Sequence, residues 1–141
     1  MQNGQRTWIA HHSDPQRAIG NGTILLVEDC PLASRALARD LARLGLLPVV
    51  ATTPLEAIHA LTKTQGAFGA ALVDFHLGCA EGTELLDYLR EEHPLVRRVF
   101  FSGDHEACER ERLQPLERSH CVVDKPWTLI SLSHALGLHR T

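Results

Sequence analysis

The chain has 141 residues, of which 44% are hydrophobic and 22% are charged, a balance typical of one soluble globular domain. Its net charge of -3 argues against a nucleic-acid surface built on bulk positive charge, and no stretch approaches the ~20 apolar residues that a membrane helix needs. The N-terminus lacks the apolar segment of a signal peptide, and the four cysteines show no CxxC spacing. These features favour a cytoplasmic protein with reduced thiols over a structural zinc site.

The N-terminal 22 residues are dominated by polar residues and glycine, with one isolated apolar pair, Trp8 and Ile9. This composition predicts a flexible N-terminal extension over residues 1–22, followed by a single domain over residues 23–141. Because the extension has little apolar surface to bury, we expect the domain to keep its stability and chemistry without it.

After the extension, short apolar runs alternate with segments of helical periodicity. The runs predict five strands, at residues 23–27, 46–51, 70–74, 96–101 and 121–123. The segments that follow them predict five helices, which begin near residues 31, 54, 83, 104 and 127. This alternation implies a doubly wound α/β domain of (βα)5 type, with a parallel sheet, right-handed crossovers and helices on both faces.

The boundaries of two helices have local signals. Pro31 opens the first helix at a favourable first-turn position, and Gly45 ends it as a C-terminal cap. The sequence Thr53-Pro54-Leu55-Glu56 has the pattern of a capping box and predicts the start of the second helix. The buried stripe of that helix is predicted to contain Leu55, Ile58 and Leu61.

The central strand of the domain is the run Ala70-Ala71-Leu72-Val73-Asp74, and residues 75–82 after it are predicted to form a loop. Four apolar residues in a row indicate a strand covered on both faces. Its terminal Asp74 would lie at the carboxyl edge of the sheet, where open α/β folds bind their ligands. The alternative is that Asp74 only caps a turn.

Polar side chains follow four of the five predicted strands. They are Glu28, Asp29, Asp74, Ser102 and Lys125. In a parallel sheet these positions share one edge, so three carboxylates, a hydroxyl and an ammonium converge there. Crowded carboxylates repel one another unless a cation neutralises them, and oxygen ligands with room for water suit Mg²⁺. An ammonium and a hydroxyl would supply donors to an anion, which is the equipment of phosphoryl transfer.

In this order, Glu28-Asp29, Asp74, Ser102-Gly103 and Lys125-Pro126 resemble the receiver domain of two-component response regulators. The resemblance covers residues 23 to about 138. It implies the flavodoxin-like fold with strand order 2-1-3-4-5. It also implies that Asp74 accepts a phosphoryl group from a phosphohistidine on a sensor histidine kinase or a histidine phosphotransfer protein.

The same resemblance implies a role for each residue of the motif. The implied Mg²⁺ ligands are Glu28, Asp29, Asp74 and the backbone carbonyl of His76. Lys125 would pair with the acyl phosphate, and Ser102 would hydrogen-bond a phosphoryl oxygen.

Two positions depart from the usual pattern of the family. Val122 stands where an aromatic residue is common on the fifth strand, so the usual movement of a ring between buried and exposed positions is missing. Gly78 replaces a common proline in the loop after Asp74, which gives a looser loop. His76 and Asp104 occupy the two positions that flank the acyl phosphate in relatives, and Asp104 could repel the phosphoryl group or orient a water molecule.

We therefore expect a stand-alone phosphoacceptor, not an enzyme, which signals to a downstream protein by protein–protein contact. The resemblance allows a homodimer through the face of the fourth helix, fifth strand and fifth helix, without direct contact to nucleic acid or membrane. The first alternative is a pseudo-receiver that acts as a phosphorylation-independent interaction module, which Val122 favours and the intact motif disfavours. A haloacid-dehalogenase-like phosphohydrolase would need an Asp where His76 stands, together with a cap domain. The chain could also be a receiver cut from a longer regulator or hybrid kinase.

Overall fold

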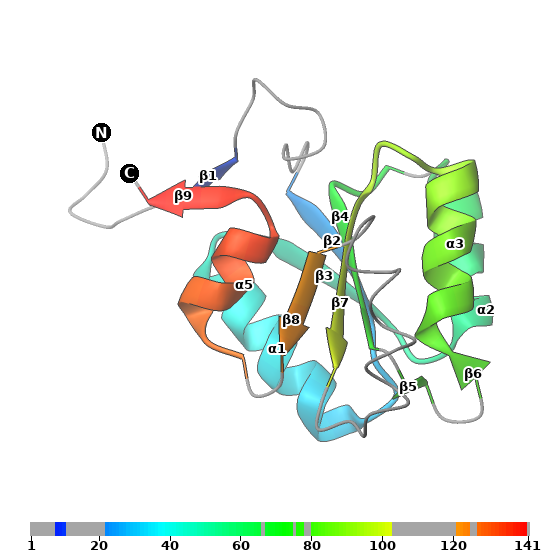
Figure 1. Ribbon diagram of the computed structural model, residues 1–141, viewed down its shortest axis with the longest axis horizontal. Helices are drawn as coiled ribbons and strands as arrows, with labels where there is room; N and C mark the ends of the chain where they lie inside the picture. Colours follow the sequence, from blue (N-terminus) through cyan, green and yellow to red (C-terminus); the bar gives the residue numbers. More distant parts are fainter. Residues whose placement is uncertain are drawn as a thin grey trace.

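A five-stranded parallel sheet forms the centre of the computed structural model, which describes residues 8–10, 22–65, 67–74, 76–77, 80–102, 121–124 and 127–140 (Figure 1). Its strands are β2 (Thr23–Val27), β3 (Leu47–Ala51), β4 (Ala70–Asp74), β7 (Arg97–Ser102) and β8 (Cys121–Asp124). They lie in the order β3-β2-β4-β7-β8. Numbered along the chain, this order is 2-1-3-4-5, so the predicted doubly wound, flavodoxin-like topology is confirmed.

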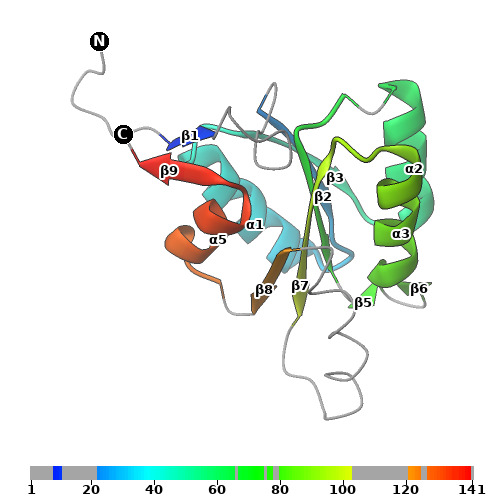
Figure 2. The same cartoon turned by 45° about the horizontal axis from the view of Figure 1, so that its top comes forward.

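Helices cover both faces of the sheet (Figures 1 and 2). The described helices are α1 (Pro31–Arg43), α2 (Pro54–Lys63), α3 (Gly82–Glu92) and α5 (Leu129–Ala135). Figure 2 shows α1 and α5 on one side of the sheet and α2 and α3 on the other. The helix predicted from Asp104 lies outside the described residues. Within the described part of the chain, no helix is long and apolar enough to span a membrane.

Each face of the sheet has its own apolar core. On one face Leu26 and Leu72 of the sheet pack with Leu37 of α1 and Leu132 of α5. On the other face, the alternate residues of the same strands pack against α2 and α3. All five residues of β4 are buried, as expected for a central strand that is covered on both sides.

The local signals for α1 and α2 are largely confirmed. Pro31 lies in the first turn of α1, and Gly45 follows its C-cap with a φ of 82°, a left-handed conformation that glycine adopts without strain. At the start of α2, the Thr53 hydroxyl accepts a hydrogen bond from the Glu56 N–H at 3.1 Å. The Glu56 carboxylate accepts hydrogen bonds from the backbone N–H of Thr52 at 2.8 Å and from the Thr52 hydroxyl at 3.0 Å. In a regular capping box this carboxylate would accept from the N–H of the N-cap residue, Thr53, so the donor here is one residue earlier.

The prediction that Leu55 is part of the buried stripe of α2 is wrong, because its side chain is 76% exposed. The buried face of the helix is defined by Ala57 and Leu61, which are four residues apart. Leu55 lies two residues before Ala57, about 200° around the helix, and so points away from the sheet. Ile58 packs, partly buried, against the same core.

Two further segments differ from the predictions. The predicted loop after Asp74 contains a small antiparallel pair, β5 (His76–Leu77) with β6 (Ala80–Glu81). The last helix starts at Leu129 after Thr128, which forms a capping box with Ser131, and it ends at Ala135. Gly137, with a φ of 72°, then turns the chain into another strand, β9 (Leu138–Arg140).

Strand β9 pairs with β1 (Trp8–Ala10), which lies within the predicted N-terminal extension. The two run antiparallel, with Trp8 opposite Arg140 and Ala10 opposite Leu138. The sequence predicted no strand here, and residues 1–7 and 11–21 lie outside the described residues. Figure 1 shows this pair beyond the C-terminal end of α5, at the opposite end of the sheet from β5 and β6.

Candidate functional site

Three carboxylates meet at the carboxyl edge of the two central strands. Glu28 and Asp29 directly follow β2, and Asp74 is the last residue of the neighbouring strand β4. Val27 is in register with Val73, which brings Glu28 level with Asp74. One carboxylate oxygen from each of the three residues lies within 4.8 Å of the other two. The predicted convergence of these residues is therefore present in the structure.

The three carboxylates differ in burial. Glu28 is 1% exposed and Asp74 is 6% exposed, whereas Asp29 is exposed to solvent. Two ionised carboxylates at about this separation repel each other by on the order of 3 kcal/mol at an effective dielectric constant of about 20. The cluster therefore favours the presence of a cation, and its donor set of carboxylate oxygens suits a hard divalent ion.

Backbone groups hold Glu28 in place. Its N–H donates to the carbonyl oxygen of Ala51 at 3.0 Å, which extends the pairing of β2 with β3 beyond the last residues of the strands. Its carboxylate Oε2 accepts a hydrogen bond from the N–H of Cys30 at 3.1 Å. This contact joins the side chain to Cys30, the N-cap residue of α1.

Gly82, the first residue of α3, packs closely against the backbone of Asp74. A Cβ atom at Gly82 would lie 2.0 Å from the backbone oxygen of Asp74 and 2.9 Å from Cγ1 of Val73. Only glycine allows the start of α3 to approach the end of β4 this closely. From the sequence, Gly82 was predicted to be the last residue of the loop, directly before the helix, and a glycine at that boundary was the available signal.

The start of α2 lies at the same edge, because it follows β3. The Thr52 backbone N–H and then its hydroxyl donate to the Glu56 carboxylate, and these bonds lower the pKa of Glu56 below its usual 4.5. Glu56 is thus held ionised as the cap of α2. It is not among the three clustered acids.

The other predicted site residues are only partly described. His76 lies in β5, in register with Glu81, and Ser102 ends β7 in register with Asp124. Lys125 lies outside the described residues, as do Gly78 and Asp104. Val122 is in β8 opposite Phe100. The roles given to His76, Ser102 and Lys125 remain predictions.

No family model matches the chain. Among curated proteins, the chain is 28% identical over 114 residues to the sensor kinase CckA of Brucella abortus (strain 2308). The aligned stretch is 81% of this chain but only 12% of the kinase.

Solved structures give a consistent set of neighbours. A response regulator receiver protein from Sinorhizobium medicae is 26% identical with a TM-score of 0.67, covering 81% of this chain and 90% of that one. A receiver domain protein from Clostridium thermocellum has a TM-score of 0.72 at 19% identity, covering 82% and 90%. The chemotaxis protein CheY4 of Vibrio cholerae has a TM-score of 0.68 at 16% identity, covering 82% and 95%.

Proposed function

The chain has the fold of response regulator receiver domains, and we propose that Asp74 is its phosphoryl acceptor. The observation that carries the proposal is the cluster of Glu28, Asp29 and Asp74, whose oxygens lie within 4.8 Å of one another at the end of the central strands. A buried acid at the tip of a fully covered strand has no role in packing the core. Ligands of open α/β sheets bind at this edge.

The cluster fits Mg²⁺ by the chemistry of its donors. Glu28, Asp29 and Asp74 would hold the ion, and the carbonyl of His76 is the further ligand that the sequence predicts. When bound, Mg²⁺ would neutralise the crowded carboxylates and the oxygens of an incoming phosphoryl group. The proposed Mg²⁺ site therefore explains why three acids share one small space.

In the proposed reaction, a carboxylate oxygen of Asp74 attacks the phosphorus atom of a phosphohistidine. A P–O bond forms, the P–N bond breaks, and the histidine nitrogen leaves with the bonding electron pair. Lys125 would pair with the resulting acyl phosphate, and Ser102 would donate a hydrogen bond to a phosphoryl oxygen. Asp74 is the acceptor in this step, so the domain is proposed as a substrate of phosphotransfer rather than an enzyme.

The phosphoryl donor is proposed to be a sensor histidine kinase or a histidine phosphotransfer protein of a phosphorelay. The similarity to a stretch of the sensor kinase CckA supports this class of partner. We propose a cytoplasmic site of action and a downstream protein target. A homodimer through the face of the predicted fourth helix, β8 and α5 is a further prediction, of which the fourth helix lies outside the described residues.

The proposal is tested by incubating the protein with acetyl phosphate and Mg²⁺ and measuring its intact mass. We expect the mass of one phosphoryl group to be added to the wild type and not to Asp74→Asn. Asp87→Asn, the same change on an exposed position of α3, is the matched control and should be labelled like the wild type. A wild type that takes up no phosphoryl group would instead indicate a pseudo-receiver.

A further inference from the structure

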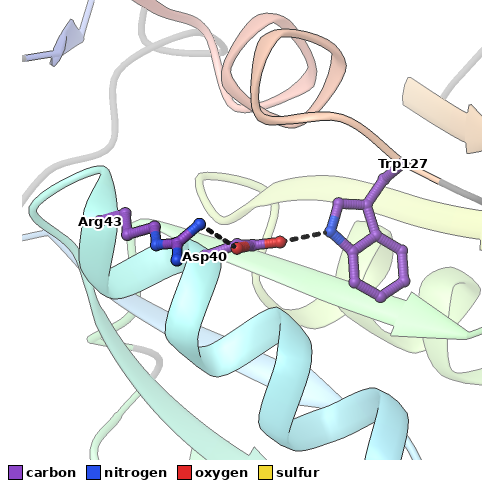
Figure 3. A network of polar contacts seen from close by, with 3 residues as sticks. All are labelled: Asp40, Arg43 and Trp127. Atoms are coloured by element: carbon purple, nitrogen blue, oxygen red, sulfur yellow. Dashed lines mark hydrogen bonds and ion pairs between the residues drawn. The ribbon is translucent and has the colours of Figure 1, made fainter.

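A polar contact between Trp127 and α1 joins distant parts of the chain. The indole Nε1–H of Trp127 donates a hydrogen bond to Oδ2 of Asp40 at 2.7 Å, across 87 residues of sequence (Figure 3). The same indole is stacked on the ring of Phe101, with ring centroids 6.1 Å apart and planes at 27°. Trp127 is thereby held between α1 and β7.

Both oxygens of the Asp40 carboxylate are used. Oδ2 accepts from Trp127, and Oδ1 lies 3.6 Å from Nη1 of Arg43 on the outer side of α1 (Figure 3). The side chain of Asp40 is 18% exposed, and that of Arg43 is mostly exposed. A short hydrogen bond to an ionised, partly buried acceptor is stronger than a neutral one, whereas the exposed ion pair contributes little. The Trp127 contact is therefore the stronger of the two.

One of the two residues that Trp127 contacts is a direct neighbour of the acidic cluster. Phe101, fully buried, is the residue of β7 in register with Asp74. Asp40 lies in the last turn of α1, whose first residue follows Asp29 by two positions, so this contact is at the other end of the helix from Asp29. Trp127 thus packs against one element that borders Asp74 and one that follows Asp29.

Trp127 is also close in sequence to Lys125. Only Lys125 and Pro126 separate it from Asp124, the last residue of β8. Asp124 in the sheet and Trp127 against α1 therefore flank Lys125 in the sequence.

We propose that Trp127 is a positioning residue for phosphoryl transfer, with the Asp40 carboxylate as its anchor. The hydrogen bond and the stacking on Phe101 hold Trp127 against α1 and against the strand next to Asp74. Lys125, two residues earlier in the sequence, is the residue that Trp127 positions. This inference rests on the proposed roles of Asp74 and Lys125. Trp127 is not one of the motif residues Glu28, Asp29, Asp74, Ser102 and Lys125.

The test separates the hydrogen bond from the packing of the ring. Trp127→Phe keeps an aromatic ring against Phe101 and removes the donor, and Asp40→Leu removes the acceptor. Both should slow phosphorylation by acetyl phosphate by about tenfold to a hundredfold, because a misplacement of about 1 Å has an effect of this size. Asp40→Asn, which keeps an acceptor oxygen, should restore most of the rate. Arg43→Gln, which removes only the exposed ion pair, is the matched control and should react like the wild type.

A double-mutant cycle identifies the residue through which Trp127 acts. In a Lys125→Ala background, Trp127→Phe should cause no further slowing, because the side chain that it positions is gone. Mg²⁺ affinity, measured by calorimetry, should be unchanged in Trp127→Phe, because none of the three carboxylates is altered. Equal slowing in both backgrounds, or a parallel loss of Mg²⁺ affinity, would show a general structural role and overturn the inference.

The remaining outcomes are also decisive. If Trp127→Phe does not fold, as judged by its thermal melt, the comparison of Asp40→Leu with Asp40→Asn carries the same test. If the wild type is phosphorylated, and Trp127→Phe and Asp40→Leu react at the same rate as the wild type, the positioning role is refuted. The proposed function is then unaffected. A wild type that takes up no phosphoryl group would refute both.

Discussion

Replacing Gly82 by alanine should damage both the stability of the domain and the chemistry of Asp74. The added Cβ would lie 2.0 Å from the backbone oxygen of Asp74 and 2.9 Å from Cγ1 of Val73. Ordinary contacts begin near 3.4 Å, so the start of α3 and the end of β4 must separate by about 1.4 Å. Both neighbours belong to a fully buried strand, which cannot move aside easily.

The expected magnitude follows from this displacement. Overpacking of this kind costs about 1–3 kcal/mol of unfolding free energy, of which the better helix propensity of alanine recovers up to about 1 kcal/mol. If the strain is released at Asp74, a shift of about 1 Å in the acceptor would lower the phosphorylation rate by up to about a hundredfold. Urea unfolding would measure the first effect, and the rate of mass gain with acetyl phosphate and Mg²⁺ would measure the second.

Gly45→Ala is the matched control. Gly45 has a φ of +82°, and a Cβ there would meet nothing within 4 Å, so the change strains the backbone without a clash. That strain costs about 1–2 kcal/mol, similar to the net cost at Gly82, but it lies at the far end of α1 from the acids. We expect both variants to be destabilised and only Gly82→Ala to react slowly. If Gly82→Ala unfolds and reacts like the wild type, the close packing of α3 against Asp74 is not required.

Three further predictions concern the carboxylates and the N-terminal strand. Asp29→Asn should weaken Mg²⁺ binding and phosphorylation together, because a carboxylate ligand is lost. Relief of carboxylate repulsion should leave the metal-free variant no less stable than the metal-free wild type. A large drop in the melting temperature of the metal-free variant would instead indicate that Asp29 stabilises the fold. The expectation from composition that residues 1–22 do not contribute to stability is corrected by the pairing of β1 with β9: their deletion should lower the melting temperature by about 2–8 °C, because β9 loses its partner. The phosphorylation rate should be unchanged, because this pair lies at the opposite end of the sheet from β5 and β6 (Figure 1), and a slower reaction would show that the pair influences the site. Because the pKa of Glu56 is lowered in the folded state, its contribution to stability is present above its usual pKa of 4.5 and is lost as the pH falls through the folded value. Glu56→Gln should therefore make the unfolding free energy less dependent on pH in this acidic range, and an unchanged pH dependence would argue against the cap formed with Thr52.

The sequence predicted the sheet and the acidic cluster because both follow from local patterns. Apolar runs such as Ala70-Ala71-Leu72-Val73 are typical of covered strands, and Pro31 and Thr53 define the starts of their helices within a few residues. Once the strands are parallel, the residues that follow them must share an edge. The proximity of Glu28, Asp29 and Asp74 therefore needed no knowledge of side-chain positions.

The features that sequence reasoning missed depend on contacts between distant segments. Strand β1 exists because it pairs with β9, more than 120 residues later, and a three-residue run has almost no signal of its own. The hydrogen bond between Trp127 and Asp40 joins two positions 87 residues apart, each unremarkable in its local sequence. Leu55 is exposed because the side of α2 that faces the sheet is the one with Ala57 and Leu61. The stripe predicted from the sequence placed Leu55 on that side, and this was wrong.

The most direct test of the central claim is to locate the phosphoryl group on the chain. After reaction with acetyl phosphate and Mg²⁺, borohydride reduces an aspartyl phosphate to an alcohol, and tandem mass spectrometry of the peptides identifies the reduced residue. We predict that the reduced residue is Asp74, that reduction depends on Mg²⁺, and that neither Glu28 nor Asp29 is reduced. Reduction at Asp29, or none at Asp74 in a protein that has gained phosphoryl mass, would contradict the assignment of Asp74 as the acceptor.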